Sequence, residues 1–197
     1  MKDTTFDFMK QSVLREKEAL EALHRDMDPK EFKKALTILL KSKLTVICAC
    51  GSSGFAGRKF AHSLCCVEKP AKFIPPSDGL HGGMGALQKG NALILVTKGG
   101  KSDELIPLTH IAKSKGAKII TVTAHTDAPL AKASDAVLLL PDVPESDRYG
   151  VMSTASFAAT IGIFDALMMG IMEETDYDAA TFARIHPGGA VGKRLNR

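Results

Sequence analysis

The chain of 197 residues has no Trp and only two Tyr, so it offers few aromatic side chains on which nucleic-acid bases could stack. Its formal net charge of +4 is small, and its Lys and Arg residues are scattered among acids rather than gathered in a stripe. Both features argue against a nucleic-acid partner, because surfaces that bind nucleic acid concentrate positive charge on one face. A small anionic ligand fits this charge balance better.

Long apolar runs are also scarce. No stretch reaches about 18 consecutive apolar residues, the length that spans a bilayer, and acids interrupt the N-terminal "MKDTTFDFMKQ" before an apolar run develops. These features predict a protein with no signal peptide and no membrane partner, and we expect it to be cytoplasmic.

The chain has four cysteines, and they form no recognisable metal or disulfide pattern. Neither the Cys48-x-Cys50 pair nor the adjacent Cys65 and Cys66 is followed by a second pair or by histidines at zinc spacing. Because all four lie within apolar segments, we expect buried free thiols. No metal site and no cofactor are predicted.

Short apolar runs dominate the middle of the chain and predict the fold. They are rich in Leu and β-branched residues and lack polar alternation, which is typical of strands covered on both faces. The runs are residues 44–50, 71–75, 91–97, 117–124 and 135–141. Helical patterns separate them, so we predict one α/β domain with a doubly wound, flavodoxin-like sheet of five parallel strands and helices on both faces.

Helical patterns also flank this region. Residues 4–27 carry apolar side chains near helical spacing, and a second helix is expected to begin with Asp28 as its N-cap and Pro29 in its first turn. We therefore divide the chain into an N-terminal helical arm, 1–42, and a domain with a C-terminal tail, 43–197. The almost wholly apolar residues 151–175 predict a long helix, buried in the core or in a subunit interface.

Two loops follow predicted neighbouring strands and are candidates for binding an anion. The first, in "CGSSGFAG", has a bare backbone and hydroxyl groups just before a helix, although its glycines do not match the dinucleotide fingerprint. An ordinary tight turn explains this loop equally well. The candidate residues are Gly51, Ser52, Ser53 and Gly54.

The second candidate loop, "TKGGKS", combines two glycines with two lysines, and we expect its last residue to cap a helix that begins there. Parallel strands end at the same edge of a sheet, so two helix N-termini would converge on one anion. The alternative is a capped helix with solvated lysines. The candidate residues are Thr97, Lys98, Gly99, Gly100, Lys101 and Ser102.

Five blocks resemble, in order and spacing, the sugar isomerase (SIS) domain of arabinose-5-phosphate isomerases, which are aldose-ketose isomerases. The similarity extends over nearly all of residues 30–195. Many members of that family continue into a pair of CBS domains. The sequence here ends at Arg197, so we expect the stand-alone form without CBS domains. The five blocks are "GSSGFAGRK", "SDGLHGGMGAL", "SDELIPL", "STASFAATIGIFDAL" and "FARIHPGGAVGKRL".

The resemblance implies a sugar phosphate held by the two loops and an enediol mechanism that moves a proton between C1 and C2 without a metal or a cofactor. It implies Glu145 and His186 as the acid-base residues. It also implies a homo-oligomer, expected to be a tetramer, in which His186 acts on sugar bound by another subunit.

Four further residues are candidates for the sugar pocket. His81 falls where the family has a pocket histidine, but it could also be an ordinary loop residue with a local hydrogen bond. The start of the long helix could add hydroxyl and free N–H groups through Ser153, Thr154 and Ser156, and ordinary helix capping accounts for these three equally well.

The sequence departs from the family pattern in both loops. Ser52 stands where the family has Lys, and Lys101 stands where it has Glu. Thr97 and Gly99 replace serines. A carboxylate acceptor has thus become an ammonium donor, so we expect a sugar phosphate other than arabinose 5-phosphate. The alternatives are a non-catalytic sugar-phosphate sensor or regulatory module, and an isomerase of a hexulose phosphate.

Overall fold

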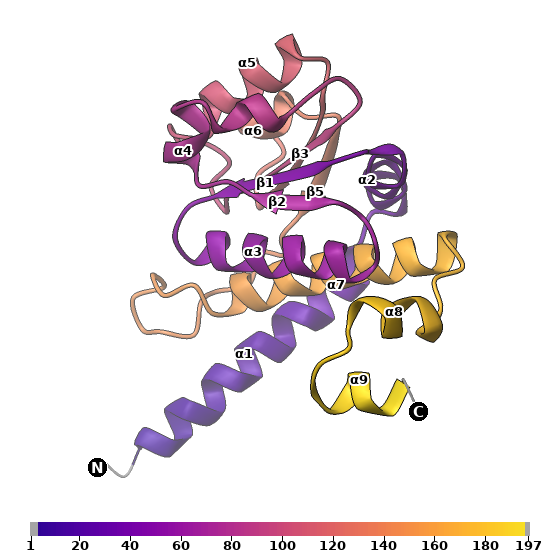
Figure 1. Ribbon diagram of the computed structural model, residues 1–197. Coiled ribbons are helices and arrows are strands. Elements are labelled where there is room, and N and C mark those ends of the chain that lie inside the picture. The colour runs from indigo at the N-terminus through magenta and orange to yellow at the C-terminus, as the bar shows by residue number, and fades with distance from the viewer. Residues whose placement is uncertain (1–3, 196–197) are drawn as a thin grey trace.

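Five parallel strands form the centre of the computed structural model, which describes residues 4–195 (Figure 1). Their order in the sheet is β2-β1-β3-β4-β5, the flavodoxin-like order that the sequence predicts. Each strand lies inside one of the predicted apolar runs. The strands are β1 (Thr45–Ala49), β2 (Ala71–Phe73), β3 (Ala92–Val96), β4 (Lys118–Thr123) and β5 (Ala136–Leu139).

Helices cover both faces of the sheet. In Figure 1, α4 (Pro76–Leu80), α5 (Ile106–Ser114) and α6 (Pro129–Lys132) lie on one face, and α3 (Gly51–Cys66) and α7 (Ala155–Glu174) lie on the other. Every residue of β1 and of β3 is buried, which is why their sequences show no polar alternation.

The remaining helices lie around these layers, and all their bounds come from the described part of the chain. They are α1 (Thr5–Asp26), α2 (Pro29–Lys41), the short 3₁₀ helix η1 (Gly83–Ala86), α8 (Ala179–Ile185) and α9 (Gly189–Leu195).

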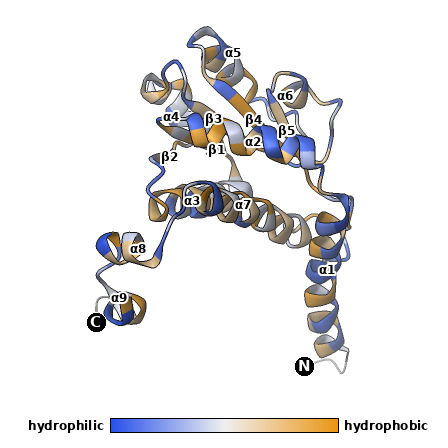
Figure 2. Ribbon diagram, turned by 90° about the vertical axis from the view of Figure 1, so that its right-hand side faces the viewer, coloured by the Kyte–Doolittle hydropathy of each residue, from blue (hydrophilic) through white to orange (hydrophobic). Residues whose placement is uncertain are grey.

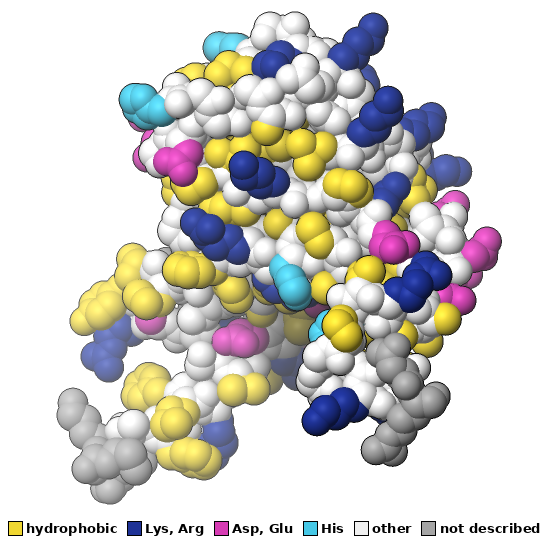
Figure 3. All heavy atoms as spheres, viewed as in Figure 1, with side chains coloured by type: hydrophobic (Ala, Val, Ile, Leu, Met, Phe, Trp, Pro, Cys, Tyr) yellow, Lys and Arg dark blue, Asp and Glu magenta, His cyan; other side chains and the backbone are white. Residues whose placement is uncertain are grey.

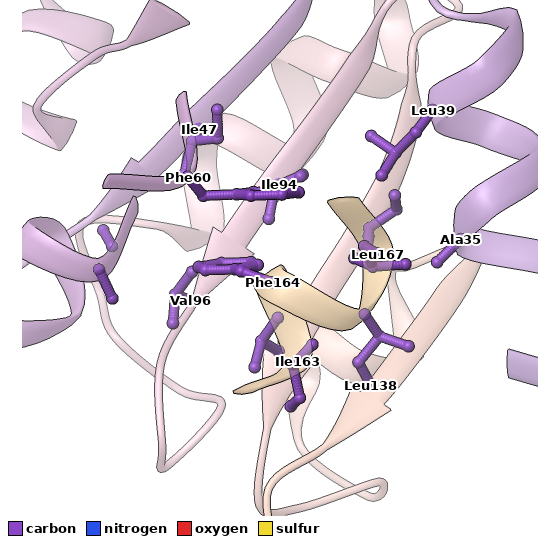
Figure 4. Packing of buried hydrophobic residues seen from close by; sticks show 14 of the residues in the cluster. Ala35, Leu39, Ile47, Phe60, Ile94, Val96, Leu138, Ile163, Phe164 and Leu167 are labelled. Carbon is purple, nitrogen blue, oxygen red and sulfur yellow. The ribbon is translucent and has the colours of Figure 1, made fainter. Parts of the chain in front are cut away.

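Successive residues of the strands point to opposite faces of the sheet and so pack into two separate hydrophobic cores. Val46 and Leu93 point into the core beneath α5, whereas Ile47 and Ile94 join the core formed with α3 and α7. At the centre of the second core, the rings of Phe60 (α3) and Phe164 (α7) stack with their centroids 4.2 Å apart, as Figure 4 shows. This contact fixes α3 against α7.

Helix α2 belongs to the same core. Asp28 accepts a hydrogen bond from the backbone N–H of Lys30 at 2.8 Å, and Pro29 lies in the first turn, as the sequence predicts. Ala35 and Leu39 are buried between the sheet and α7 (Figure 4). Of the predicted arm, this second helix is therefore part of the packed body.

Helix α1 packs on α7 through one end only. Ala19 and Leu23 are buried in the core, and Gly162 of α7 allows the approach, because a Cβ there would lie 3.0 Å from Leu23. The first half of α1 projects from the body, with Phe8 and Val13 exposed. Figure 2 shows this projection as a ribbon, and Figure 3 shows the hydrophobic side chains along it.

By length and hydropathy, α7 is the single helix of residues 4–195 that could cross a membrane, although 39% of its apolar window is buried inside the protein. This helix still contains no run of about 18 consecutive apolar residues, because Ser156, Thr160 and Asp165 interrupt it. Packing against α1, α2 and α3 accounts for the apolar composition of α7.

The expectation of buried thiols is correct for one cysteine. All four cysteines are free, but only Cys48, within β1, is buried. Cys50 and Cys65 are exposed, and Cys66 is intermediate. Each of these three lies at the first or last turn of α3, where apolar neighbours in the sequence do not ensure burial.

Candidate active site

The first candidate loop is the start of α3, directly after β1. Within residues 4–195, the backbone N–H groups of Gly51, Ser52 and Ser53 have no hydrogen-bond partner, as expected for the first turn of a helix. Gly51 has a φ of +53°, and Gly54 leaves little room for a side chain, since a Cβ would lie 3.1 Å from the carbonyl oxygen of Ala49. The turn therefore presents bare backbone donors.

The second candidate loop follows β3 and lies beside the first, because Ala49 pairs with Val96 at the ends of the two strands. Gly100 closes the turn: it has a φ of +66°, and its N–H bonds to the carbonyl oxygen of Thr97 at 3.2 Å. A Cβ on Gly100 would lie 2.4 Å from the Cβ of Ala128. Glycine is thus required there for both conformation and space.

The helix that follows this turn begins later than the sequence analysis expects. Ser102 does not cap it; its hydroxyl lies 2.8 Å from that of Thr97, while its carbonyl oxygen accepts from Leu105 and Ile106. Helix α5 begins at Ile106, where Pro107 fixes the first helical turn. The backbone N–H groups of Gly99, Lys101 and Ser102 have no partner in the described range 4–195.

A cavity of about 240 Å³ lies against these loops. The first loop contributes two serines, the second contributes Lys98, and the rest of the wall comes from the segment before α7 and from α7 itself. Its walls combine several hydroxyl groups with one acid and one lysine. The lining residues are Ser52, Ser53, Lys98, Leu140, Glu145, Gly150, Val151, Ser153, Ser156, Phe157 and Thr160.

Glu145 is the one buried acid of this cavity, and its side chain is only 4% exposed. Its Oε2 accepts hydrogen bonds from the start of α7: from the Thr154 N–H at 2.9 Å, the Thr154 hydroxyl at 3.2 Å and the Ser156 N–H at 3.2 Å. Its Oε1 accepts from Lys98 Nζ at 2.6 Å. The carboxylate therefore joins the second loop to the N-terminus of α7.

These contacts determine the protonation of Glu145. Burial alone would raise the pKa of Glu145, but the hydrogen bonds from Lys98 and from the start of α7 outweigh burial and lower the pKa to about 2. With no ligand in the cavity, Glu145 is a charged hydrogen-bond acceptor at neutral pH.

Asp147 shapes the loop between Glu145 and α7. Its carboxylate accepts from the backbone N–H groups of Tyr149, Val151 and Met152 at 2.7 to 2.9 Å. These bonds, led by the one from Met152, hold the pKa of Asp147 below its ordinary value. The ordered loop brings Gly150 and Val151 to the cavity.

Comparison with known proteins decides the family. The SIS domain model matches residues 38–170. The chain belongs to the SIS domain family. The arabinose 5-phosphate isomerase KpsF of Escherichia coli is 32% identical over 188 residues, which are 95% of this chain and 58% of that protein. The arabinose 5-phosphate isomerase KdsD of Pseudomonas aeruginosa is 32% identical over 84% of this chain and 51% of that protein. The chain thus spans little more than half the length of these relatives.

Solved structures agree with this assignment. A Listeria monocytogenes protein, provisionally described as a sugar-phosphate isomerase, is 35% identical with a TM-score of 0.91, over 95% of this chain and 100% of that one. An Escherichia coli CFT073 protein, solved in complex with arabinose 5-phosphate, is 25% identical with a TM-score of 0.87, over 95% and 100% of the two chains. The SIS fold of this chain is therefore established.

This SIS domain brings together some of the predicted site residues and separates others. Ser52, Ser53, Lys98, Glu145 and Ser153 line the cavity, and the Thr154 hydroxyl and N–H hold Glu145. Gly99, Gly100, Thr97 and Ser102 form the adjacent turn without lining the cavity.

Three further predicted residues also do not line the cavity of their own chain. Lys101 is exposed at the turn, and His81 is exposed at the end of α4. His186 follows α8, stacks on Phe182 with ring centroids 4.8 Å apart, and has a buried Nδ1 without a partner within residues 4–195.

Sequence reasoning missed the contribution of α7 beyond its first residues. Thr160 lines the cavity together with Ser156, which the sequence did suggest. The spacing of four residues between them was the available signal, because it places both on one face of a helix.

Proposed function

We propose that this SIS-domain protein is an aldose-ketose isomerase of a phosphorylated sugar. The observation that carries the proposal is the buried carboxylate of Glu145 in a cavity bordered by two turns with unpaired backbone donors. Backbone N–H groups at a helix N-terminus are suited to a phosphate, and a carboxylate beside them is suited to proton transfer.

The phosphate is held by the N–H groups of the two turns, and the sugar extends into the cavity. Glu145 takes the proton from C2 of the aldose and returns it to C1, while His186 moves the hydroxyl proton between the two oxygens. Holding the phosphate away from the reacting carbons aligns C2 with the carboxylate, which lowers the entropic cost of the reaction.

We propose that His186 belongs to a neighbouring subunit of a cytoplasmic homotetramer. The position of the C-terminal tail supports this. Glu145 bonds to the first turn of α7, whereas α8, which carries His186 at its end, follows the last turn of α7. A helix of 20 residues is about 30 Å long, so the two ends of α7 lie about that far apart.

The relatives' names make arabinose 5-phosphate the first sugar to test, and the changes at Ser52 and Lys101 favour a different one. Wild-type protein is mixed with a panel of pentose and hexose phosphates in heavy water, and deuterium entry at C2 is followed by proton NMR. Exchange should appear with at least one sugar and fall at least 100-fold in E145Q and H186A.

Two matched variants control this experiment. E173Q and H110A change an exposed Glu of α7 and an exposed His of α5, and both should exchange like wild type. Thermal stabilisation by a sugar phosphate without any exchange would overturn the isomerase proposal in favour of a sensor, because a ligand that binds only the folded state stabilises it without chemistry.

A further inference from the structure

We infer that Lys98 supplies the positive charge that stabilises the reacting oxygen of the sugar, moving its ammonium group from Glu145 to the substrate. This inference rests on the proposed isomerase function. Lys98 lies where the second loop reaches the cavity. In this reaction Glu145 takes the proton from carbon, and Lys98 stabilises the negative charge that develops on oxygen.

The composition of the cavity wall identifies Lys98. Among the described residues that line the cavity, Lys98 is the single cationic one. Lys101, in the same turn, is exposed and does not reach the wall. The first loop contributes only uncharged serines, Ser52 and Ser53, to the same cavity. The ammonium group of this cavity therefore comes from the second loop.

The two oxygens of Glu145 are held differently. Oε2 receives three hydrogen bonds from the first turn of α7, whereas Oε1 receives one, from Lys98. When Lys98 leaves, the carboxylate remains fixed through Oε2 and presents Oε1 to the cavity. Oε1 is thus the oxygen placed to accept a proton from the sugar.

Lys98 is the partner that can move. Its side chain is 47% exposed and has a flexible four-carbon stem, whereas the side chain of Glu145 is 4% exposed and held by α7. A sugar oxygen that carries developing negative charge competes directly with Oε1 for the ammonium group. The exchange of partners leaves neither charge without a hydrogen bond at the moment of reaction.

The step balances without another reactant. The C2–H bond breaks and its proton binds Glu145 Oε1, while the electron pair forms the C1=C2 bond. The π electrons of the C1 carbonyl move onto the C1 oxygen, and Lys98 donates a hydrogen bond to the negative charge that results. His186 carries the proton of the C2 hydroxyl to the C1 oxygen, which moves the negative charge to the C2 oxygen. The C2=O bond then forms, the C1=C2 electron pair takes the proton back from Glu145 at C1, and the Lys98–Glu145 pair is restored.

The movement of Lys98 from Glu145 to the sugar also makes Glu145 a stronger base when substrate binds. Lys98 is the first of the hydrogen-bond partners that lower the pKa of Glu145 to about 2, and its departure leaves burial, which raises the pKa, less opposed. The carboxylate becomes a stronger base only when the sugar has taken the ammonium group.

The test is C2 exchange and turnover in K98M, with K98Q as a second neutral variant and K98R as the charge-retaining one. We use the sugar phosphate that wild type exchanges fastest. Loss of one donor to a developing oxyanion reduces kcat by about 100-fold or more, so we expect that loss in K98M and K98Q, a smaller one in K98R and a lesser effect on KM. Thermal unfolding verifies that each variant is folded.

A matched control is K118M. Lys118 forms a similar ion pair with Asp135, at 2.7 Å, where β4 begins, at the opposite end of the sheet from the two loops. K118M should keep wild-type kcat. The acid limb of the kcat/KM profile, which reports the free enzyme, should also move to higher pH in K98M, because Glu145 of the free enzyme has lost its ammonium partner.

The possible outcomes separate the inference from the proposed function. Wild-type exchange combined with a loss in K98M and K98Q, and none in K118M, supports Lys98. Exchange within about threefold of wild type in folded K98M overturns the role of Lys98 and leaves the isomerase standing. No exchange by wild type with any sugar of the panel overturns both.

Discussion

Replacing Glu145 by Gln removes the charge that joins the second loop to α7 while keeping the shape of the side chain. The amide side chain could still receive the N–H bonds of Thr154 and Ser156, but it would carry no charge to pair with Lys98. The variant therefore isolates the electrostatic part of this contact.

The magnitude follows from the pKa of Glu145, which the folded protein lowers from its ordinary value of 4.5 to about 2. A depressed pKa stabilises the fold above the unfolded value, and this stability is lost as the pH falls toward the folded value. At 1.36 kcal/mol per pKa unit, Glu145 contributes about 3 kcal/mol at pH 7 and about 1 kcal/mol at pH 3.

The assay is urea unfolding of wild type and E145Q at several pH values between 7 and 3. Other acids titrate in both proteins and cancel, so the difference in unfolding free energy should shrink by about 2 kcal/mol over this range. The shrinkage should be concentrated below pH 4.5, the ordinary pKa of Glu145. A difference that does not change with pH would refute the assignment of a charged, hydrogen-bonded Glu145.

Three further changes test the scaffold of the site. G100A forces a positive φ and places a Cβ 2.4 Å from a neighbouring Cβ, so urea unfolding should show a loss of about 2 kcal/mol or more, whereas G99A, with open space, should lose under about 1 kcal/mol. F60A removes a fully buried ring that stacks on Phe164 and should cost about 3 to 5 kcal/mol in the same assay; a loss under about 1 kcal/mol would contradict the packing. D147A frees three backbone N–H groups in an exposed loop, so limited proteolysis near residues 148–152 should accelerate while the melting temperature changes by only a few degrees. Unchanged cleavage would show that Asp147 does not order the loop.

The strands were predictable because burial on both faces leaves a direct trace in the sequence. Residues 92–96 read as an unbroken apolar run for the same reason that β3 is fully buried. The adjacency of the two loops followed from the parallel order of β1 and β3. Both inferences depend on local pattern and on general rules of sheet topology.

The start of α5 was not predictable from capping residues alone. Ser102 has the chemistry of an N-cap, but its hydroxyl pairs with Thr97 across the turn, and the helix begins only at Ile106. A contact between side chains five positions apart competes with the cap, and propensity does not reveal which contact prevails.

The pairing of Lys98 with Glu145 was beyond sequence reasoning for a related reason. The two residues are 47 positions apart, and the loop that carries Glu145 has no regular structure whose register would fix its direction. Their meeting depends on Asp147 and the first turn of α7, which together orient the loop. The sequence suggested Glu145 as an acid-base residue and Lys98 as a cation of the second loop. It did not predict that the two contact each other.

The most direct test of the site is a crystal structure of the protein with the sugar phosphate that it exchanges or binds. The account predicts the phosphate on the backbone N–H groups of Ser52 or Ser102 and the sugar in the cavity, with Lys98 Nζ on a sugar oxygen. A sugar phosphate bound at another surface, or bound with Lys98 still paired to Glu145 and out of reach of the sugar, would contradict it.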